Sequence, residues 1–209
     1  MRWFVNKNIL LRFLRVLCYK LAMEMNINTI LMMGKTGSGK GTQAKLLSDR
    51  VGFEIFSSGD KFRELRSRED WLGERIHEEY DKGLLMPHWF ASFLFEEKLL
   101  NTPPKQGLIF EGSGRKKPEA ELFDEVATWL KRDYAVINIK VSDEEAIKRM
   151  KDRGRSDGLD VTEKIKNRLD EYRNYTEPAI EFFRSRGKVI DIDGMPAPEI
   201  IHENILEKL

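Results

Sequence analysis

The chain has 209 residues, which is enough for one large domain with a well-buried core. Its 36 Lys and Arg residues balance 35 Asp and Glu, and a net charge of +1 gives no support for bulk nucleic-acid binding. A lone cysteine, Cys18, excludes a disulfide framework and a cysteine metal site. The three histidines lack the spacing of metal ligands, so no zinc site is expected (His77, His88, His202).

Residues 1–25 differ from the rest, because basic residues occur there among apolar ones with no acid before Glu24. Arg12 and Arg15 interrupt the apolar run, which is therefore too short and too charged for a transmembrane segment or a signal-peptide core. Three interpretations stay open: a loosely packed extension ahead of a start at Met23 or Met25, an amphipathic helix that contacts a surface weakly, or a targeting segment. The folded domain is expected over 26–209.

From Asn26 onward, predicted strands and helices alternate. The strands are predicted at 29–33, 52–56, 107–110, 135–141 and 189–192. One helix is predicted from the glycine-rich loop to about Arg50, and others at 60–66, 71–80, 88–100, 144–152 and 198–209. A further helix starts at Pro118 and carries Leu122, Val126 and Leu130 at spacings of four residues, and a long helical region at 162–186 is interrupted at Pro178. In the last helix, Ile201 and Ile205 are expected to face inward. This order predicts an α/β fold with a doubly wound, parallel five-stranded sheet and helices on both faces. A ligand is then expected at the carboxyl ends of the strands.

The strand 29–33 leads into the glycine-rich stretch 34–43, of sequence GKTGSGKGTQ. Glycines let the backbone wrap closely around an anion, and the amides of the loop and of the next helix can point at phosphates. Lys40 would add a positive charge and Thr42 a hydroxyl for magnesium. The hydroxyl comes one place later than in the general motif, because Gly41 follows Lys40. The alternative is an ordinary glycine-rich turn between strand and helix.

Two further polar segments follow strand ends. Ser58 and Arg63 lie in the stretch 57–63, where a hydroxyl and an arginine one helical turn apart can face an anion; a simple helix cap with a solvated arginine is the alternative. Glu111 and Arg115 follow the strand 107–110, where a carboxylate can hold magnesium and a guanidinium can fork onto a phosphate. A capped turn would explain the second segment equally well.

A set of arginines occupies the C-terminal half of the chain. Arg149 and Arg153 are four residues apart on one helical face, opposite Ile147 and Met150, which should pack on the sheet. Two more arginines follow in the next loop and helix (Arg155, Arg168). The alternative is a solvated basic face, but all these segments fall where a single pocket could collect them.

Taken together, these motifs resemble the adenylate kinase family of nucleoside monophosphate (NMP) kinases. The resemblance rests on Gly-Lys-Gly-Thr-Gln after the loop, Ser-Gly-Asp-x-x-Arg at 58–63, the Glu-Gly-x-x-Arg turn at 111–115, and the arginine series, in the family's order over about 27–209. It implies a P-loop nucleoside triphosphate hydrolase-like domain, a small helical NMP-binding insert at about 57–87, and a short lid at about 154–161. This short-lid type lacks the zinc-binding insert of some relatives.

The resemblance also implies roles for individual residues. ATP-binding residues would be Gly37, Ser38, Gly39, Lys40, Gly41, Thr42, Arg149 and Arg153. NMP-binding residues would be Ser58, Arg63, Leu84, Leu85, Met86, Gly112, Arg115, Glu119, Arg155 and Arg168. The catalytic residues would be Lys40, Arg115, Arg149, Arg153, Arg155 and Arg168, with Mg²⁺ held by Thr42 and Glu111 directly or through water.

The sequence departs from the family pattern at several of these positions. Glu111 stands where the family has an aspartate, and Ser113-Gly114 replaces its Phe-Pro. Glu119 occupies the place of the glutamine that reads the acceptor base; a carboxylate accepts from adenine N6 but leaves N1 without a donor, so CMP also fits this pattern. Gly158 replaces one of the family's paired lid carboxylates, which leaves Asp157 and Asp160 as candidates.

These observations predict ATP-dependent phosphoryl transfer to a nucleoside monophosphate, foremost ATP + AMP to two ADP. The alternatives are a kinase for another acceptor, such as CMP or UMP, and a non-catalytic nucleotide-binding protein of the same fold. The predicted partners are small molecules, with no nucleic acid and no zinc. A cytoplasmic monomer is expected.

Overall fold

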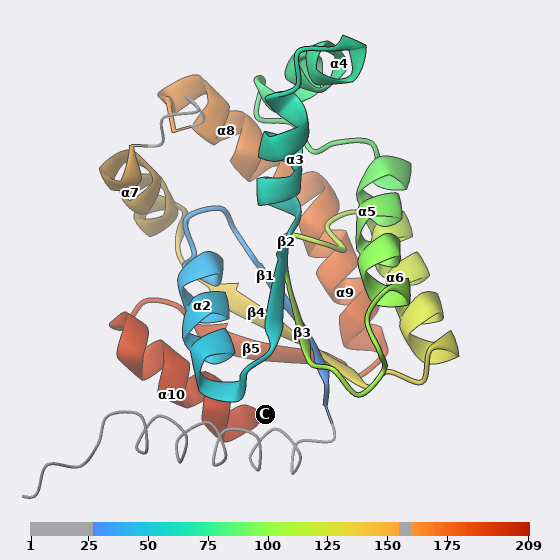
Figure 1. The fold of residues 1–209 in the computed structure, drawn as a ribbon. Helices are drawn as coiled ribbons and strands as arrows, with labels where there is room; N and C mark the ends of the chain where they lie inside the picture. The colour runs from blue at the N-terminus through green and yellow to red at the C-terminus, as the bar shows by residue number, and fades with distance from the viewer. Residues whose placement is uncertain (1–26, 155–159) are drawn as a thin grey trace, which may run out of the picture.

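A five-stranded parallel sheet forms the centre of the protein in the computed structural model, which describes residues 27–154 and 160–209 (Figure 1). The strands run in the order β2-β3-β1-β4-β5. Their bounds are β1 Thr29–Gly34, β2 Glu54–Ser57, β3 Leu108–Glu111, β4 Tyr134–Lys140 and β5 Val189–Asp193. The predicted fold class is therefore confirmed.

The register of the sheet brings three strand ends together. Met32 of β1 pairs with Glu111 of β3, and Glu111 pairs with Ser57 of β2. β1 lies between β3 and β4 and is buried along its whole length, which agrees with its uninterrupted apolar sequence. The segments that follow β1, β2 and β3 consequently start side by side at the same edge of the sheet.

Helices cover both faces of the sheet. Their bounds are α2 Lys40–Val51, α3 Ser58–Arg66, α4 Trp71–Tyr80, α5 His88–Leu100, α6 Lys117–Trp129, α7 Asp143–Arg153, α8 Thr162–Glu171, α9 Glu177–Ser185 and α10 Pro198–Lys208, with a π-helical turn η1 at Tyr172–Thr176. α2 and α10 cover one face, and α5, α6 and α9 the other (Figure 1). α3, α4, α7 and α8 stand around the carboxyl edge (Figure 1).

The buried faces of two helices differ from the predicted ones. On α6, Phe123 is fully buried and contacts the rings of Phe95, Phe110 and Tyr134, whereas the predicted Val126 and Leu130 are only partly buried. On α7, the predicted pair Ile147 and Met150 packs in a separate cluster with α8 residues (Ile165, Leu169), not on the main body of the sheet. The reason is the position of α7, which begins beyond the end of β4 and lies beside α8 at the carboxyl edge of the sheet (Figure 1).

The long C-terminal helical region is interrupted earlier than predicted. The change occurs in the π-helical turn Tyr172–Thr176, whereas Pro178 lies within the first turn of α9. Proline has no N–H to donate to a carbonyl in the preceding turn, so the hydrogen-bond pattern must change before it. Ile201 and Ile205 of α10 are buried, as predicted.

The predicted extension at 1–25 and most of the predicted lid lie outside the described residues. Within the described part, each helix falls short of the length and apolar character that crossing a membrane requires.

Candidate active site

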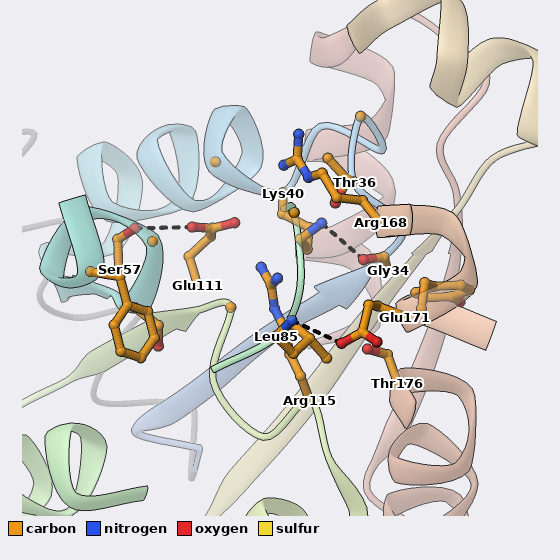
Figure 2. A pocket seen from close by; sticks show the side chains of 18 of the residues that line it. Gly34, Thr36, Lys40, Ser57, Leu85, Glu111, Arg115, Arg168, Glu171 and Thr176 are labelled. Atoms are coloured by element: carbon orange, nitrogen blue, oxygen red, sulfur yellow. Dashed lines mark hydrogen bonds between the residues drawn. The ribbon is translucent and has the colours of Figure 1, made fainter. Parts of the chain in front are cut away.

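A cavity of about 600 Å³ opens at the carboxyl edge of the sheet (Figure 2). It collects predicted site residues from segments far apart in the sequence. They are Gly37, Gly39, Lys40, Gly41, Thr42, Ser58, Arg63, Leu84, Leu85, Met86, Glu111, Gly112, Arg115, Glu119, Arg149, Arg153 and Arg168. Ser38 is fully buried and does not line the cavity, and Arg155 lies outside the described residues.

The glycine-rich loop connects β1 to the first turn of α2. Gly37 has a φ of 86°, and a Cβ on it would lie 2.6 Å from the carbonyl oxygen of Ala146, so this position requires glycine. Gly39 precedes α2, and among the described residues no side chain caps that helix N-terminus. The first amides of α2 therefore keep their hydrogen-bonding capacity for an anion in the cavity.

Lys40 is the positive charge of this loop. Its side chain is buried, and Nζ donates to the carbonyl oxygens of Gly34 at 2.9 Å and Lys35 at 2.7 Å (Figure 2). The pKa of Lys40 is lowered to about 7, first by burial and then by the positive charge of Arg115, while Glu111 opposes the change. A polyanion beside Lys40 would favour its charged form.

Hydroxyl groups fix the start of α3 against the end of β3. Ser57 accepts a hydrogen bond from the Asp60 amide at 3.2 Å and donates one to Glu111 Oε2 at 3.1 Å (Figure 2). Ser58 and Ser113 share a buried hydroxyl–hydroxyl bond of 2.8 Å. The segments that sequence reasoning placed separately, at 57–63 and 110–115, are thus bonded to each other.

Arg115 extends into the cavity from the turn after β3 (Figure 2). Gly112 in this turn has a φ of 84°, and a Cβ on it would lie 2.7 Å from Arg115 Nη2, so glycine makes room for the guanidinium. Within the described part of the chain, the Arg115 side chain has no ion pair and no hydrogen bond. Its charge is available to a ligand.

The other arginines of the cavity already contact carboxylates of the same chain. Arg153 binds both oxygens of Asp160, at 2.9 and 2.8 Å, and Arg168 contacts the same carboxylate at 3.0 Å. Arg149 pairs with Glu145 at 2.6 Å. Arg63 pairs with Asp60 and also donates to the Tyr80 hydroxyl at 3.4 Å.

Sequence reasoning missed several residues of this wall. Glu171 accepts a hydrogen bond from the Leu85 amide at 2.8 Å and so ties α8 to the 81–87 connection (Figure 2). Tyr80, Tyr172 and Thr176 also line the cavity. The spacing offered one usable signal, because Glu171 lies three residues after Arg168 and shares its helical face.

Glu119 is the one deeply buried carboxylate of the predicted acceptor side, with 2% of its surface exposed. It is the third residue of α6, and its Oε2 accepts a hydrogen bond from the Arg115 amide at 2.8 Å. Burial raises the pKa of Glu119 to about 7, although the Arg115 and Lys116 amides and charges oppose this change.

The oxygen donors in the cavity fit a magnesium ion. The Thr42 hydroxyl and the Glu111 carboxylate both line it, and such oxygens are the ligands that Mg²⁺ prefers. Among the described residues, no three His, Cys, Asp or Glu side chains group as a cage for a metal.

Comparisons with known proteins agree with this geometry. A family model described as "Adenylate kinase" matches residues 32–188. The "Adenylate kinase 1" of Synechocystis sp. is 36% identical over 181 residues, which cover 86% of this chain and 95% of the relative. "Adenylate kinase" from Thermus thermophilus is 33% identical, covering 84% and 94%. "Adenylate kinase" from Archaeoglobus fulgidus is 31% identical, covering 86% and 98%. The chain therefore belongs to the adenylate kinase family of phosphotransferases.

Proposed function

We propose that the protein transfers the γ-phosphoryl group of ATP to AMP and so forms two molecules of ADP. Family membership supports the reaction. The observation that carries the proposal for this chain is the composition of the cavity wall. One cavity holds the glycine-rich loop and, facing it, the acceptor-side groups Ser58, Arg63 and Arg115. A protein that only bound ATP would have no use for a second set of phosphate-binding groups.

In this proposal, one set of residues binds ATP and another binds the acceptor. The loop Gly37–Thr42 with Arg149 and Arg153 binds ATP; Ser38 belongs to this loop and is fully buried. The insert at about 57–87, the turn at 112–115, Glu119 and Arg168 bind the acceptor. Leu84, Leu85 and Met86 line the space for its base. Arg155, which lies outside the described residues, is proposed to bind the acceptor and to act in catalysis as part of the short lid at about 154–161.

The chemistry needs no catalytic base. The acceptor is a phosphate oxygen whose second pKa is about 6, so it is largely dianionic near neutral pH. Catalysis then consists of aligning two anionic groups and neutralising the charge that develops between them. Lys40, Arg115 and the arginines of α7 and α8 supply that charge from several elements, and closure of these elements excludes water as a competing acceptor.

Magnesium enters this proposal as the ion bound with ATP. The Thr42 hydroxyl and the Glu111 carboxylate would hold it, with the Ser57 hydroxyl fixing the Glu111 oxygen at 3.1 Å. Mg²⁺ supplies positive charge to the phosphate oxygens when bound. The longer Glu111 side chain, compared with an aspartate, is positioned by this serine.

The compartment and the oligomeric state remain predictions from the sequence. The lone Cys18 and the absence of a disulfide framework favour the cytoplasm. A monomer remains the expectation from the sequence. For residues 1–25, comparing membrane binding of the full chain with a chain that starts at Met25 separates the three interpretations.

An acceptor panel tests the proposal. ADP formation is measured with ATP, Mg²⁺ and each of AMP, CMP, UMP, GMP and dTMP. The highest kcat/KM is expected with AMP. Preferred use of CMP would transfer the proposal to a pyrimidine acceptor. If no acceptor yields ADP while ATP binds tightly, the protein is a nucleotide-binding relative without turnover.

A further inference from the structure

We propose that Glu119 reads the acceptor base in its neutral, protonated form, with its O–H donating to N1 of adenine and its carbonyl oxygen accepting from the N6 amino group. This inference rests on the proposed function and concerns the same cavity. It assigns a protonation state to Glu119, which stands where the family has a glutamine. The enzyme's preference among acceptor bases would then depend on pH.

The surroundings of Glu119 favour the neutral form. The side chain lines the cavity with only 2% of its surface exposed, and no lysine, arginine or histidine within the described chain forms an ion pair with it. Burial dominates its electrostatics and raises its pKa to about 7. A buried carboxyl without a paired cation neutralises by taking up a proton.

The hydrogen bond to the backbone places the proton. Oε2 accepts from the Arg115 amide at 2.8 Å. Since the carbonyl oxygen of a neutral carboxyl is its stronger acceptor, we expect the proton on Oε1. A neutral carboxyl held in this way offers one donor and one acceptor side by side, which is the pattern of a glutamine amide.

This pattern matches one edge of adenine. Adenine presents an amino donor at N6 beside an acceptor at N1, and the neutral carboxyl satisfies both. An ionised carboxylate would place an acceptor against N1, which leaves two lone pairs opposed in a desolvated site. Hypoxanthine, the base of IMP, presents N1–H and O6 instead, so the ionised form of Glu119 suits N1–H.

Other ionisable groups share the cavity and must be separated from Glu119. Arg115 and Lys116 act on it from the loop before α6 and lower its pKa. The helices α5 and α9 pack against α6. In the described part of the chain, α5 contributes the uncharged Ala91 to the cavity lining and α9 contributes no lining residue. The other described ionisable side chains of the cavity are those of Lys40, Asp60, Tyr80, Glu111, Glu171 and Tyr172, besides the arginines.

The ratio of two acceptors isolates Glu119 from these groups. AMP and IMP carry the same ribose 5′-phosphate, so titration of that phosphate, of Lys40 and of the other groups affects both. From a pKa of about 7, the neutral fraction of Glu119 falls from about 0.9 at pH 6 to about 0.1 at pH 8. Since binding weakens in proportion to the competent fraction, the ratio of kcat/KM for AMP over IMP should fall by about tenfold or more over this range.

Glu119→Gln provides the comparison, because it fixes the neutral pattern at every pH. Its AMP-to-IMP ratio should stay constant from pH 6 to 8, and at pH 8 its KM for AMP should be about tenfold lower than that of the unmodified enzyme. Glu121→Gln makes the same chemical change two residues along α6, at a half-exposed side chain near Lys117, and should leave the pH dependence of the ratio as it is.

Proton uptake gives a second readout. AMP is titrated calorimetrically at pH 8 in buffers of different ionisation enthalpy. Glu119→Gln should take up about one proton fewer than the unmodified protein, and the difference between the two proteins removes any proton taken up by Lys40. If Glu119 only capped α6, its replacement would shift Tm and leave both the ratio and the proton uptake unchanged.

The outcomes separate this inference from the proposed function. A constant AMP-to-IMP ratio between pH 6 and 8 in the unmodified enzyme, with AMP readily phosphorylated and the same proton uptake as Glu119→Gln, overturns the inference and leaves the function standing. Absence of ADP formation from AMP at every pH overturns the function itself.

Discussion

The glycine-rich loop holds its charge in a buried position set by the backbone, whereas the arginines of α7 and α8 pair with carboxylates of the same chain. Lys40 donates to two loop carbonyls, and glycine geometry determines where they lie. Arg153 and Arg168 instead share Asp160. A phosphate arriving at the loop meets groups already in position, but one arriving at the arginines must replace or join an existing partner. Substitutions in the loop and substitutions of these arginines should therefore have different effects on activity and stability.

The largest effect is expected at the loop. Lys40→Met should lower kcat by about 10³ or more, because it removes a desolvated charge directed at the transferring group. The coupled assay for ADP measures this change, and circular dichroism verifies the fold. Lys45→Met, on the exposed face of α2, is the matched control and should retain activity. Near-normal turnover of Lys40→Met would contradict the assignment of the loop.

Arg115→Ala comes next, with kcat/KM for the acceptor expected to fall by about 10²–10³. Its Tm should stay unchanged, because the guanidinium has no partner within the described chain that the substitution would leave unpaired. Activity and thermal unfolding are measured on the same preparation. A large loss of Tm would show that Arg115 has a structural role instead.

Arg168→Ala should combine a loss of activity with a loss of stability. The Asp160 side chain is 3% exposed and would lose one of the arginines that contact it in the described part of the chain, at an expected cost of about 1–3 kcal/mol. For a chain of this size that corresponds to a Tm lower by roughly 2–10 °C. Arg75→Ala, which breaks exposed pairs on α4, should cost under about 1 kcal/mol. Equal Tm values for the two variants would show that the contact between Arg168 and Asp160 contributes no more to stability than an exposed ion pair.

The smallest effect is expected for Ser57→Ala. This substitution removes the N-cap of α3 and the hydrogen bond to Glu111, so stability should fall by about 1 kcal/mol and Tm by about 3 °C. The Mg²⁺ concentration required for half-maximal activity should rise as well. Ser185→Ala, whose hydroxyl donates to the Phe182 carbonyl at an exposed helix end, is the control. An unchanged Mg²⁺ requirement would show that Ser57 does not position Glu111.

The sequence was sufficient for the elements that depend on local pattern. All five strands, the glycine-rich loop and the helix His88–Leu100 occur where the apolar runs and the Gly and Pro residues predict them. Strand order depends on pairing between distant segments, so it was not part of the prediction. The same holds for the packing of Ile147 and Met150, which follows from where α7 lies and not from its own periodicity.

In the candidate site too, some residues follow from local sequence pattern and others only from tertiary structure. Motif spacing identified Lys40 and Arg115, because glycine and arginine patterns after strand ends have a direct physical meaning. Glu171 was missed since its function depends on reaching the Leu85 amide, 86 residues earlier in the chain. The sharing of Asp160 by two arginines also comes from tertiary structure, and it determines how the resting cavity keeps its charges paired.

The most direct test follows the γ-phosphoryl group of labelled ATP with and without AMP. Transfer between substrates held in one closed cavity predicts that the label enters ADP only when AMP is present, with little inorganic phosphate. Label that appears as phosphate at the same rate with or without AMP would contradict the account, since the acceptor groups facing the loop would then have no part in the reaction.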